Sequence, residues 1–449
     1  LPAAGGPGPR GGGGGGRGVV SRLVLRGARA PGDVAVRDGR IEAVGRVPPA
    51  PGDEVLDCEG CLVTPGLVNT HHHLYQWLTR GRAVDQGLFG WLVTLYPVWA
   101  RLDPEDVAAA ARVGLAELAV SGASTVADHH YVVPGGDDSV FDALADAARA
   151  VGVRLHLSRG SMDLGQSHGG LPPDQVVEDT EAILASTEAV AGRLQDGERV
   201  FVNVAPCSPF SVSTTLLEES AALARRLGLR LHTHLAETKD EERECLARFG
   251  RRPVAVLDEL GWVGPDVWVA HGVHLDAGEV ARLGAARTGV AHCPTSNGRL
   301  GSGICPVVPL RRAGAPVGLG VDGAASNECG RLQPELRQAL VLARLAAGDA
   351  GALQPAEVLA MATAEGAACL GLEDVGRLEP GARADLAVWD LGDAWDVADP
   401  VAAFVLGPER PCRTLLVGGE VVVEGGEPTR VDLGAARAEL ARRARRLWP

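Results

Sequence analysis

The amino-acid sequence predicts an α/β protein, in which a (β/α)8 TIM-like barrel carries a small β-sandwich domain built from both chain ends. From residue 65 onward, apolar β-rich runs alternate with stretches rich in Ala, Leu, Arg and Glu, and this alternation indicates a parallel sheet. Eight such units follow within about 250 residues, which is the usual span of a closed (β/α)8 barrel. On either side of this region, short β-rich runs follow one another without helices, as in a small antiparallel sheet.

The chain begins with a Gly- and Pro-rich segment, residues 1–17, which contains six consecutive glycines. It lacks the apolar core of a secretory signal, and its composition is typical of a disordered tail. Residues 18–64 are predicted to form the first part of the β domain. Their β-rich runs cover residues 19–25, 33–36 and 40–44.

Residues 65–374 are predicted to form the barrel. We expect its first strand to cover residues 62–68 and to run straight into a cluster of histidines. The other seven strands are expected over residues 124–128, 153–157, 200–204, 229–234, 267–271, 289–292 and 317–322. Helical stretches lie between most of them, including residues 104–120, 174–194, 216–227 and 239–260.

The β-rich pattern returns in residues 375–432, with runs at 384–389, 413–417 and 421–423. We expect these strands to pair with those of residues 18–64, so that the two chain ends form one small β domain beside the barrel. The closing segment, residues 433–449, is rich in Ala and Arg and predicts a surface helix over residues 433–447.

Composition and charge exclude several classes of function. The net charge of -14 argues against non-specific binding to nucleic acid or to an anionic membrane, both of which require a basic surface. The chain contains no apolar run of about 20 residues, the length needed to span a bilayer. Nine cysteines, an odd number, indicate reduced thiols and a cytoplasmic protein. Without a second CxxC, we interpret Cys58 and Cys61 as two small buried residues and not as a zinc or redox motif.

Metal-binding side chains follow four of the predicted strands. Side chains alternate along a strand, so His71 and His73 share a face. The other strand ends carry His232, His234, His271 and Asp322. Catalytic groups of a (β/α)8 barrel lie at these ends, and His71, His73, His234 and Asp322 would form a mixed N/O site suited to zinc or iron(II). Glu237 follows His234 by three residues and could act beside the metal as general acid and base.

These motifs are similar to those of the amidohydrolase superfamily, and more narrowly to its aminohydrolase branch acting on purines, pterins and s-triazines. The similarity extends over nearly the whole chain after residue 18. Further matching segments cover residues 65–70, 292–297 and 376–386. Some members hold two metals bridged by a carboxylated lysine at the end of strand four. Lys239 is the only lysine and lies beyond strand five, so we expect one metal ion per subunit, with zinc preferred over iron.

The resemblance implies that a metal-activated water attacks a ring carbon that bears an amino group. Glu237 would protonate the adjacent ring nitrogen, His271 or Asp322 would take the water proton, and ammonia would leave. Loop segments resemble those of members that convert 8-oxoguanine to urate. Deamination of isoxanthopterin, guanine or an s-triazine remains an alternative, and an inactive binding protein of the same fold is a second one.

The resemblance also implies that the protein forms a homo-oligomer, and it implies a set of substrate contacts. Gln76 carries a donor and an acceptor that can read an amide edge. The other candidates for the walls and edges of the pocket are Trp91, Tyr131, Cys207 and Phe210. We expect His232 to support the metal site by hydrogen bonding, and Ser326 to cap its loop.

Overall fold

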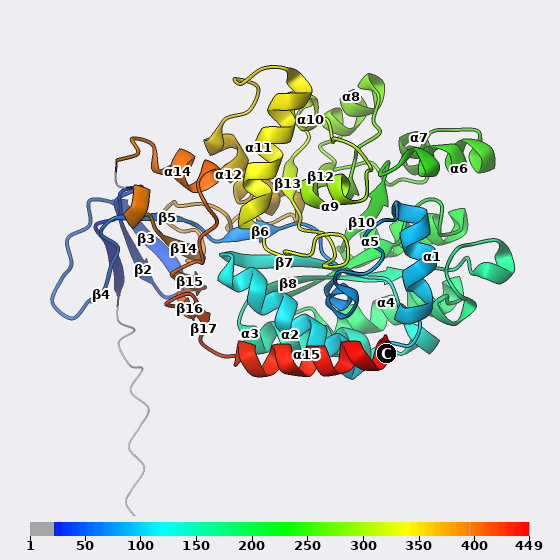
Figure 1. Cartoon of the computed structure of the whole chain (residues 1–449), viewed down its shortest axis with the longest axis horizontal. Coiled ribbons are helices and arrows are strands. Elements are labelled where there is room, and N and C mark those ends of the chain that lie inside the picture. Colours follow the sequence, from blue (N-terminus) through cyan, green and yellow to red (C-terminus); the bar gives the residue numbers. More distant parts are fainter. Residues whose placement is uncertain (1–21, 395, 449) are drawn as a thin grey trace, which may run out of the picture.

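The computed structural model describes residues 22–394 and 396–448 (Figure 1). The tail predicted over residues 1–17 lies outside this range, as does the start of the strand predicted over residues 19–25. Eight parallel strands close into a barrel in the order β6-β7-β8-β9-β10-β11-β12-β13, and helices surround it. The predicted (β/α)8 barrel is therefore confirmed.

The barrel strands overlap the predicted runs but differ from them at several ends, and one prediction fails. Their bounds are β6 Leu67–Asn69, β7 Ala123–His130, β8 Arg154–Ser161, β9 Val200–Pro206, β10 Arg230–Leu235, β11 Val267–His271, β12 Gly289–His292 and β13 Val317–Leu319. The single strand predicted over residues 62–68 is wrong, because β5 (Cys61–Pro65) belongs to the small domain and β6 to the barrel. A β-carbon at Gly66, between them, would lie 2.5 Å from Ser124 Cβ, so the chain crosses where a side chain would not fit.

The helices largely follow the predicted stretches. Their bounds are η1 Leu74–Thr79, α1 Leu88–Trp99, α2 Pro104–Val120, α3 Ser139–Val151, α4 Thr180–Leu194, α5 Thr214–Leu227, α6 Lys239–Phe249, α7 Pro253–Glu259, α8 Ala277–Ala285, α9 Pro294–Arg299, α10 Val307–Ala313, α11 Gln333–Ala347, α12 Pro355–Met361, α13 Ala364–Cys369, α14 Pro400–Leu406 and α15 Leu433–Leu447. One predicted helix, residues 239–260, is two helices, because Gly250 ends α6 in a left-handed conformation and Pro253 begins α7. The helix predicted over residues 174–194 begins later, at Thr180.

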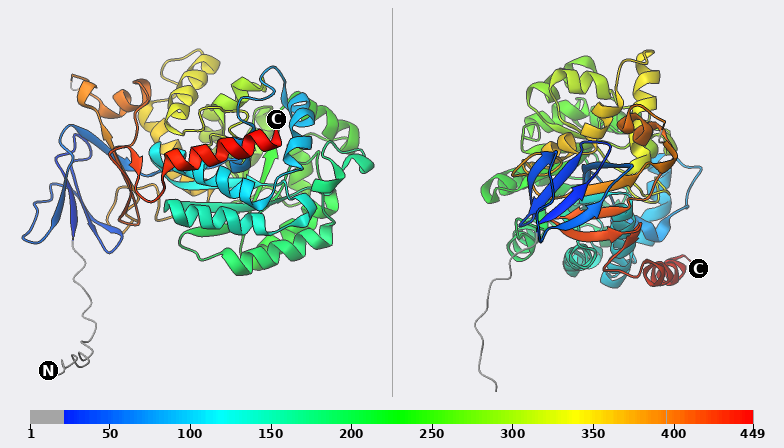
Figure 2. Two further views of the ribbon diagram at one scale, coloured as in Figure 1. Left: turned by 60° about the horizontal axis from the view of Figure 1, so that its bottom comes forward. Right: turned by 90° about the vertical axis from the view of Figure 1, so that its left-hand side faces the viewer.

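The small domain consists of two sheets, and it lies at one side of the barrel (Figure 2). One sheet has the order β3-β2-β1-β4 and the other β17-β16-β15-β14-β5. Their strands are β1 Leu23–Arg26, β2 Asp33–Arg37, β3 Arg40–Gly45, β4 Glu54–Asp57, β14 Leu386–Asp390, β15 Thr414–Val417, β16 Glu420–Glu424 and β17 Glu427–Pro428. The two chain ends meet where β5 pairs antiparallel with β14. The first sheet is not wholly antiparallel, because β1 pairs parallel with β4.

Apolar side chains from both sheets form the core of the small domain. Leu25 and Val34 of one sheet pack in the same cluster as Val63 and Val388 of the other. Cys58 and Cys61 are buried in this cluster, which supports their interpretation as small core residues. All nine cysteines of the chain are free, and the exposed one is Cys329.

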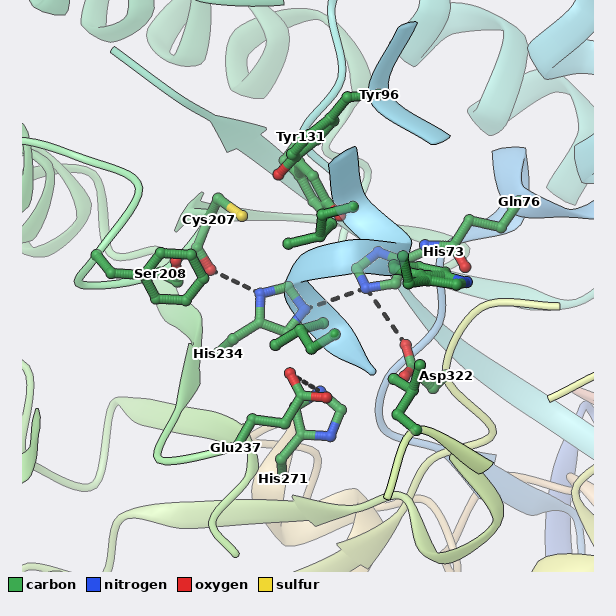
Figure 3. A pocket seen from close by; sticks show the side chains of 15 residues that line it. His73, Gln76, Tyr96, Tyr131, Cys207, Ser208, His234, Glu237, His271 and Asp322 are labelled. Atoms are coloured by element: carbon green, nitrogen blue, oxygen red, sulfur yellow. Dashed lines mark hydrogen bonds and ion pairs between the residues drawn. The ribbon is translucent and has the colours of Figure 1, made fainter. Parts of the chain in front are cut away.

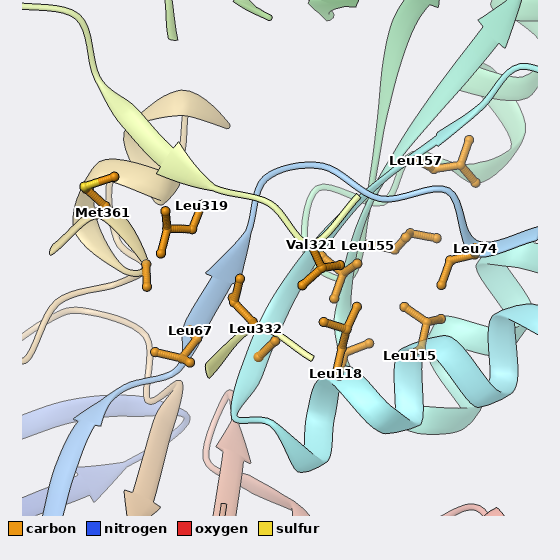
Figure 4. Close-up of a cluster of buried hydrophobic side chains, with 14 of the residues drawn as sticks. Leu67, Leu74, Leu115, Leu118, Leu155, Leu157, Leu319, Val321, Leu332 and Met361 are labelled. Atoms are coloured by element: carbon orange, nitrogen blue, oxygen red, sulfur yellow. The ribbon is translucent and has the colours of Figure 1, made fainter. Parts of the chain in front are cut away.

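The barrel core lies between the strands and the helices around them. Leu115 and Leu118 of α2 and Leu155 and Leu157 of β8 belong to one continuous buried cluster (Figure 4).

None of the described helices is both long enough and apolar enough to cross a bilayer.

Two ionic contacts connect distant parts of the chain. Arg154, at the start of β8, makes a bidentate pair with Asp385, Nε to Oδ2 at 2.9 Å and Nη2 to Oδ1 at 3.1 Å, and both side chains are buried. The C-terminal helix α15 lies along α2 (Figure 1), where Arg443 contacts Asp106 at 3.1 Å. The first contact joins the barrel to the small domain, and the second holds the chain end against the barrel.

Candidate active site

Four predicted ligand side chains meet at the C-terminal ends of the barrel strands, and Figure 3 shows three of them, His73, His234 and Asp322. His73 Nε2 lies 3.1 Å from His234 Nε2 and 3.3 Å from Asp322 Oδ1. His71 Nε2 lies 3.5 Å from the same carboxylate oxygen. All four side chains are buried. His72 points elsewhere, as strand alternation predicts, and accepts a hydrogen bond from Trp77 Nε1 at 3.4 Å.

The hydrogen bonds behind the three histidines determine which ring nitrogen carries the proton. His73 Nδ1 lies 2.6 Å from His129 O, and His234 Nδ1 lies 2.6 Å from Cys207 O. A nitrogen that faces a carbonyl oxygen must donate, so the Nε2 atom of each ring keeps its lone pair.

His71 reaches the same state through a second histidine. Its Nδ1 lies 2.8 Å from His232 Nε2, and His232 Nδ1 lies 2.9 Å from Trp268 O. His232 therefore donates to the carbonyl and accepts from His71, whose Nε2 is left with a lone pair. His232 thus makes the supporting hydrogen bond expected from the sequence.

Three Nε2 lone pairs and one carboxylate oxygen thus converge with no proton between them. Among the described residues, His71 Nε2 has no hydrogen-bond partner. Burial lowers the pKa of His71, His73 and His234, which keeps the rings neutral. Neutral imidazoles and a carboxylate are a donor set for zinc and related ions. The residues present therefore fit a divalent metal ion.

Two serine hydroxyl groups and the backbone N–H of Gly323 hold Asp322 in place. Its Oδ2 accepts from Ser296 Oγ at 2.5 Å and lies 3.1 Å from Ser326 Oγ. Burial alone would raise the pKa of Asp322, but its contacts with His71 and His271 hold it well below the usual range. Ser326 also contacts Gly323 O at 3.2 Å, the loop-capping bond expected from the sequence.

Glu237 and His271 form a second pair beside the four ligands. His271 Nε2 lies 3.6 Å from Glu237 Oε2, and His271 Nδ1 lies 2.9 Å from Asn297 Oδ1. Burial raises the pKa of Glu237 to about 7. Burial lowers the pKa of His271, but the carboxylates of Glu237 and Asp322 more than offset this and raise it. The pair can therefore exchange protons near neutral pH.

The backbone is strained around these groups. Ala236, His271 and Asp322 have φ values of +53°, +75° and +60°, which non-glycine residues rarely adopt. Such conformations persist where the surrounding structure imposes them, and they cluster at functional sites.

One supporting residue has no counterpart in the sequence analysis. Glu241, fully buried in α6, accepts hydrogen bonds from the backbone N–H groups of Ala236 and Glu237, both at 2.8 Å. It therefore fixes the loop that presents Glu237. The detectable signal is the spacing of Thr238 and Glu241, which is that of a helix N-terminal capping box.

A cavity opens beside the ligand cluster, at the C-terminal ends of the barrel strands. Five sequence-predicted residues line it: Gln76, Trp91, Tyr131, Cys207 and Phe210. Five further residues also line it but were not among those predictions: Leu88, Leu92, Tyr96, Ser208 and Leu300. The cavity also reaches His73, His234, Glu237, His271 and Asp322.

Gln76 contributes a free acceptor to this cavity. Its Oε1 is buried and has no hydrogen-bond partner in the described part of the chain. A β-carbon at Gly323 would lie 1.8 Å from this oxygen, so the absence of a side chain there makes room for the amide. Trp91, by contrast, uses its Nε1 to donate to Ala325 O at 3.1 Å, which leaves its ring as an apolar wall.

Known proteins resemble the chain along most of its length. A model of the amidohydrolase family matches residues 62–422. The chain is 48% identical over 429 residues to an 8-oxoguanine deaminase of Pseudomonas aeruginosa, which covers 93% of this chain and 95% of that protein. It is 40% identical over 443 residues to an isoxanthopterin deaminase of an unknown prokaryotic organism, with coverages of 90% and 92%. An atrazine chlorohydrolase of Arthrobacter aurescens complexed with zinc has a TM-score of 0.88 at 30% identity, and covers 94% of this chain and 100% of that one.

Proposed function

The chain belongs to the amidohydrolase family and is a deaminase, and we propose that it hydrolyses 8-oxoguanine to urate and ammonia. One observation carries the proposal. Three imidazole nitrogens with free lone pairs meet one carboxylate oxygen, directly beside the proton-exchanging pair Glu237 and His271. Such a site suits the addition of water to an amino-bearing ring carbon.

We further propose that His71, His73, His234 and Asp322 hold one divalent metal ion per subunit, with zinc as the first candidate and iron(II) as the alternative. Imidazole and carboxylate ligands suit both ions, and a relative of the same fold is a zinc complex. Lys239 is exposed at the start of α6, so it cannot bridge a second ion in the barrel. When bound, the ion lowers the pKa of a water molecule and makes it a nucleophile at neutral pH.

The chain's own residues are proposed to move the protons. The carboxyl group of Glu237, with its pKa of about 7, would donate a proton to the ring nitrogen next to the attacked carbon. His271 or Asp322 would take the proton that the attacking water loses. Hydroxide thus adds to carbon, one proton moves to the ring nitrogen, and a second proton leaves with the amino group as ammonia.

The cavity residues are proposed to select the heterocycle. Gln76 Oε1 lacks a partner in the described residues and would accept from a ring N–H of the substrate. Trp91 and Phe210 would cover the faces of a flat ring system, and Tyr131 and Cys207 would lie at its edges. Isoxanthopterin, guanine and s-triazines present a similar amino-bearing carbon and remain the alternative substrates. The 48% identity to an 8-oxoguanine deaminase, against 40% to an isoxanthopterin deaminase, favours 8-oxoguanine.

The test is ammonia release by zinc-loaded protein from 8-oxoguanine, guanine and isoxanthopterin in parallel. We expect kcat/KM to be highest for 8-oxoguanine and to fall at least about 100-fold in Glu237→Gln, because the variant cannot donate the proton. Glu218→Gln, on the exposed face of α5, is the matched control and should match the parent. Higher turnover of another heterocycle would change the substrate assignment, whereas no ammonia from any would contradict deamination of these substrates.

We also propose that the protein acts in the cytoplasm as a homo-oligomer. The free thiols of its nine cysteines suit a reducing compartment. Sedimentation analysis of the purified chain tests the second part, and a monomer at all concentrations would contradict it.

A further inference from the structure

Glu335 is a buried carboxylate that no step of the proposed mechanism uses. It lies in the first turn of α11, is 0% exposed and does not line the substrate cavity. Its Oε2 accepts a hydrogen bond from the backbone N–H of Thr295 at 3.0 Å, and its Oε1 accepts one from Asn327 Nδ2 at 2.9 Å. It therefore ties α9, which follows β12, to the loop after β13.

Each of these two segments places a serine hydroxyl on Asp322. Ser296 follows Thr295, and its Oγ lies 2.5 Å from Asp322 Oδ2. Ser326 precedes Asn327, and its Oγ lies 3.1 Å from the same oxygen. The two hydroxyls are also 2.9 Å apart. Both neighbours of Glu335 are thus one residue away from a group that fixes Asp322.

Asp322 needs this support because of its backbone and its direction. Its φ of +60° is unfavourable for a residue with a side chain, so the surroundings must hold it. With Oδ2 held by the serines, Oδ1 is the atom that faces His71 and His73. Asn327 adds a third connection, because its Nδ2 also donates to Val321 O at 2.9 Å.

A carboxylate at this place is costly for stability alone. Among the described residues, Glu335 forms no ion pair with an arginine or lysine, and burial raises its pKa to about 7. A buried charge without a paired cation is unfavourable unless hydrogen bonds compensate it. Its two acceptor atoms are matched to two donors, which neither an apolar residue nor an amide could satisfy at once.

We propose that Glu335 is a positioning residue that orients Asp322 toward the metal by joining α9, which carries Ser296, to the loop that carries Ser326. The proposal rests on the proposed function, because it takes Asp322 as a metal ligand. Residues that orient ligands in this way typically change metal affinity or activity by about 10- to 100-fold when they are lost.

Glu335→Gln tests this, because the amide keeps the shape but turns one acceptor into a donor that faces an N–H. We expect the zinc dissociation constant, measured by competition with a chromophoric chelator, to rise at least about tenfold. We expect kcat to fall while KM stays within about twofold, because the substrate contacts are untouched. Glu357→Gln is the matched control, since Glu357 holds the same position in α12 but pairs with Arg311 and not with the site. It should keep the parent's zinc affinity.

A double-mutant cycle separates positioning from general stability. Ser296→Ala/Ser326→Ala should weaken zinc binding by a similar factor, and adding Glu335→Gln to it should cost less than about twofold more. Zinc affinity within twofold of the parent in Glu335→Gln, or an undiminished further loss in the serine background, would overturn the proposal. If Glu335→Gln does not fold, the serine variant decides, since parental zinc affinity there also overturns it. A parent protein that binds no zinc would overturn the metal site, and this proposal with it.

Discussion

Replacing Gly323 by alanine should displace the side-chain amide of Gln76 although residue 76 itself is unchanged. A β-carbon at position 323 would lie 1.8 Å from Gln76 Oε1, whereas such contacts rarely fall below 3.0 Å. The amide of Gln76 must therefore move away by about 1.2 Å. Because Gly323 does not have a left-handed backbone, alanine meets no backbone strain there, and the clash is relieved by movement of the Gln76 side chain. The displaced oxygen can no longer accept from a substrate placed at the ligand cluster.

The size of the effect follows from the loss of one hydrogen bond in a buried site. Leaving one partner unsatisfied there costs about 1–3 kcal/mol, which corresponds to a fall in kcat/KM of about 5- to 150-fold. Gln76→Ala should lose the same amount. The double variant Gly323→Ala/Gln76→Ala should have the same kcat/KM as Gln76→Ala, because both substitutions remove the same hydrogen bond to the substrate.

Steady-state ammonia release with 8-oxoguanine measures all three variants against the parent. Zinc affinity is the control, because Gly323 N also donates to Asp322 Oδ1 at 2.8 Å. We expect the zinc dissociation constant of Gly323→Ala to stay within about twofold of the parent. Parental kcat/KM in Gly323→Ala, or multiplied losses in the double variant, would refute the role of Gln76.

Three further outcomes can be measured on the folded protein. Arg154→Ala should lower the free energy of unfolding by about 3–5 kcal/mol in urea denaturation, because Asp385 is left as an unpaired buried charge. Arg226→Ala, which breaks an exposed ion pair, is the control and should cost less than about 1 kcal/mol. Equal losses in the two variants would contradict the prediction. Burial raises the pKa of Asp128 to about 7, so the contribution of this carboxyl group to the free energy of unfolding should fall as pH rises from about 4 to about 7. The difference in unfolding free energy between the parent and Asp128→Asn, which keeps the acceptor for Leu74 N, should shift toward the variant over this range, and a difference that does not change with pH would speak against it. Removing zinc from a sample held at 1,000 times its dissociation constant should cost about 4 kcal/mol and lower the unfolding temperature; an unchanged temperature would mean that zinc does not bind the folded site.

The sequence predicts the barrel and its ligand cluster because both depend on short-range patterns. The alternation of His71 and His73 on one strand end, and the position of Asp322 after another, follow from strand geometry and barrel topology. The division of residues 62–68 into two strands does not, since the apolar pattern continues across Pro65, whereas β5 pairs with β14 and β6 with β7 only in the folded chain.

Supporting residues are harder to predict, because some of their partners are backbone groups, which every residue carries. Glu241 and Glu335 each accept from a main-chain N–H, which leaves no pairing pattern between side chains. His232 is the intermediate case, where its place two residues before His234 indicates a supporting role but its contact with His71 requires the closed barrel. The free acceptor of Gln76 likewise appears only once Gly323 packs against it.

The most direct measurement of the proposed metal centre is the metal content of the purified protein by elemental analysis, alongside His234→Ala. One equivalent of zinc or iron per chain in the parent, and less than about a tenth in the variant, is expected because the variant loses one of four ligands. Deamination by a parent protein that holds no metal, or a full equivalent retained by His234→Ala, would contradict the metal centre formed by His71, His73, His234 and Asp322.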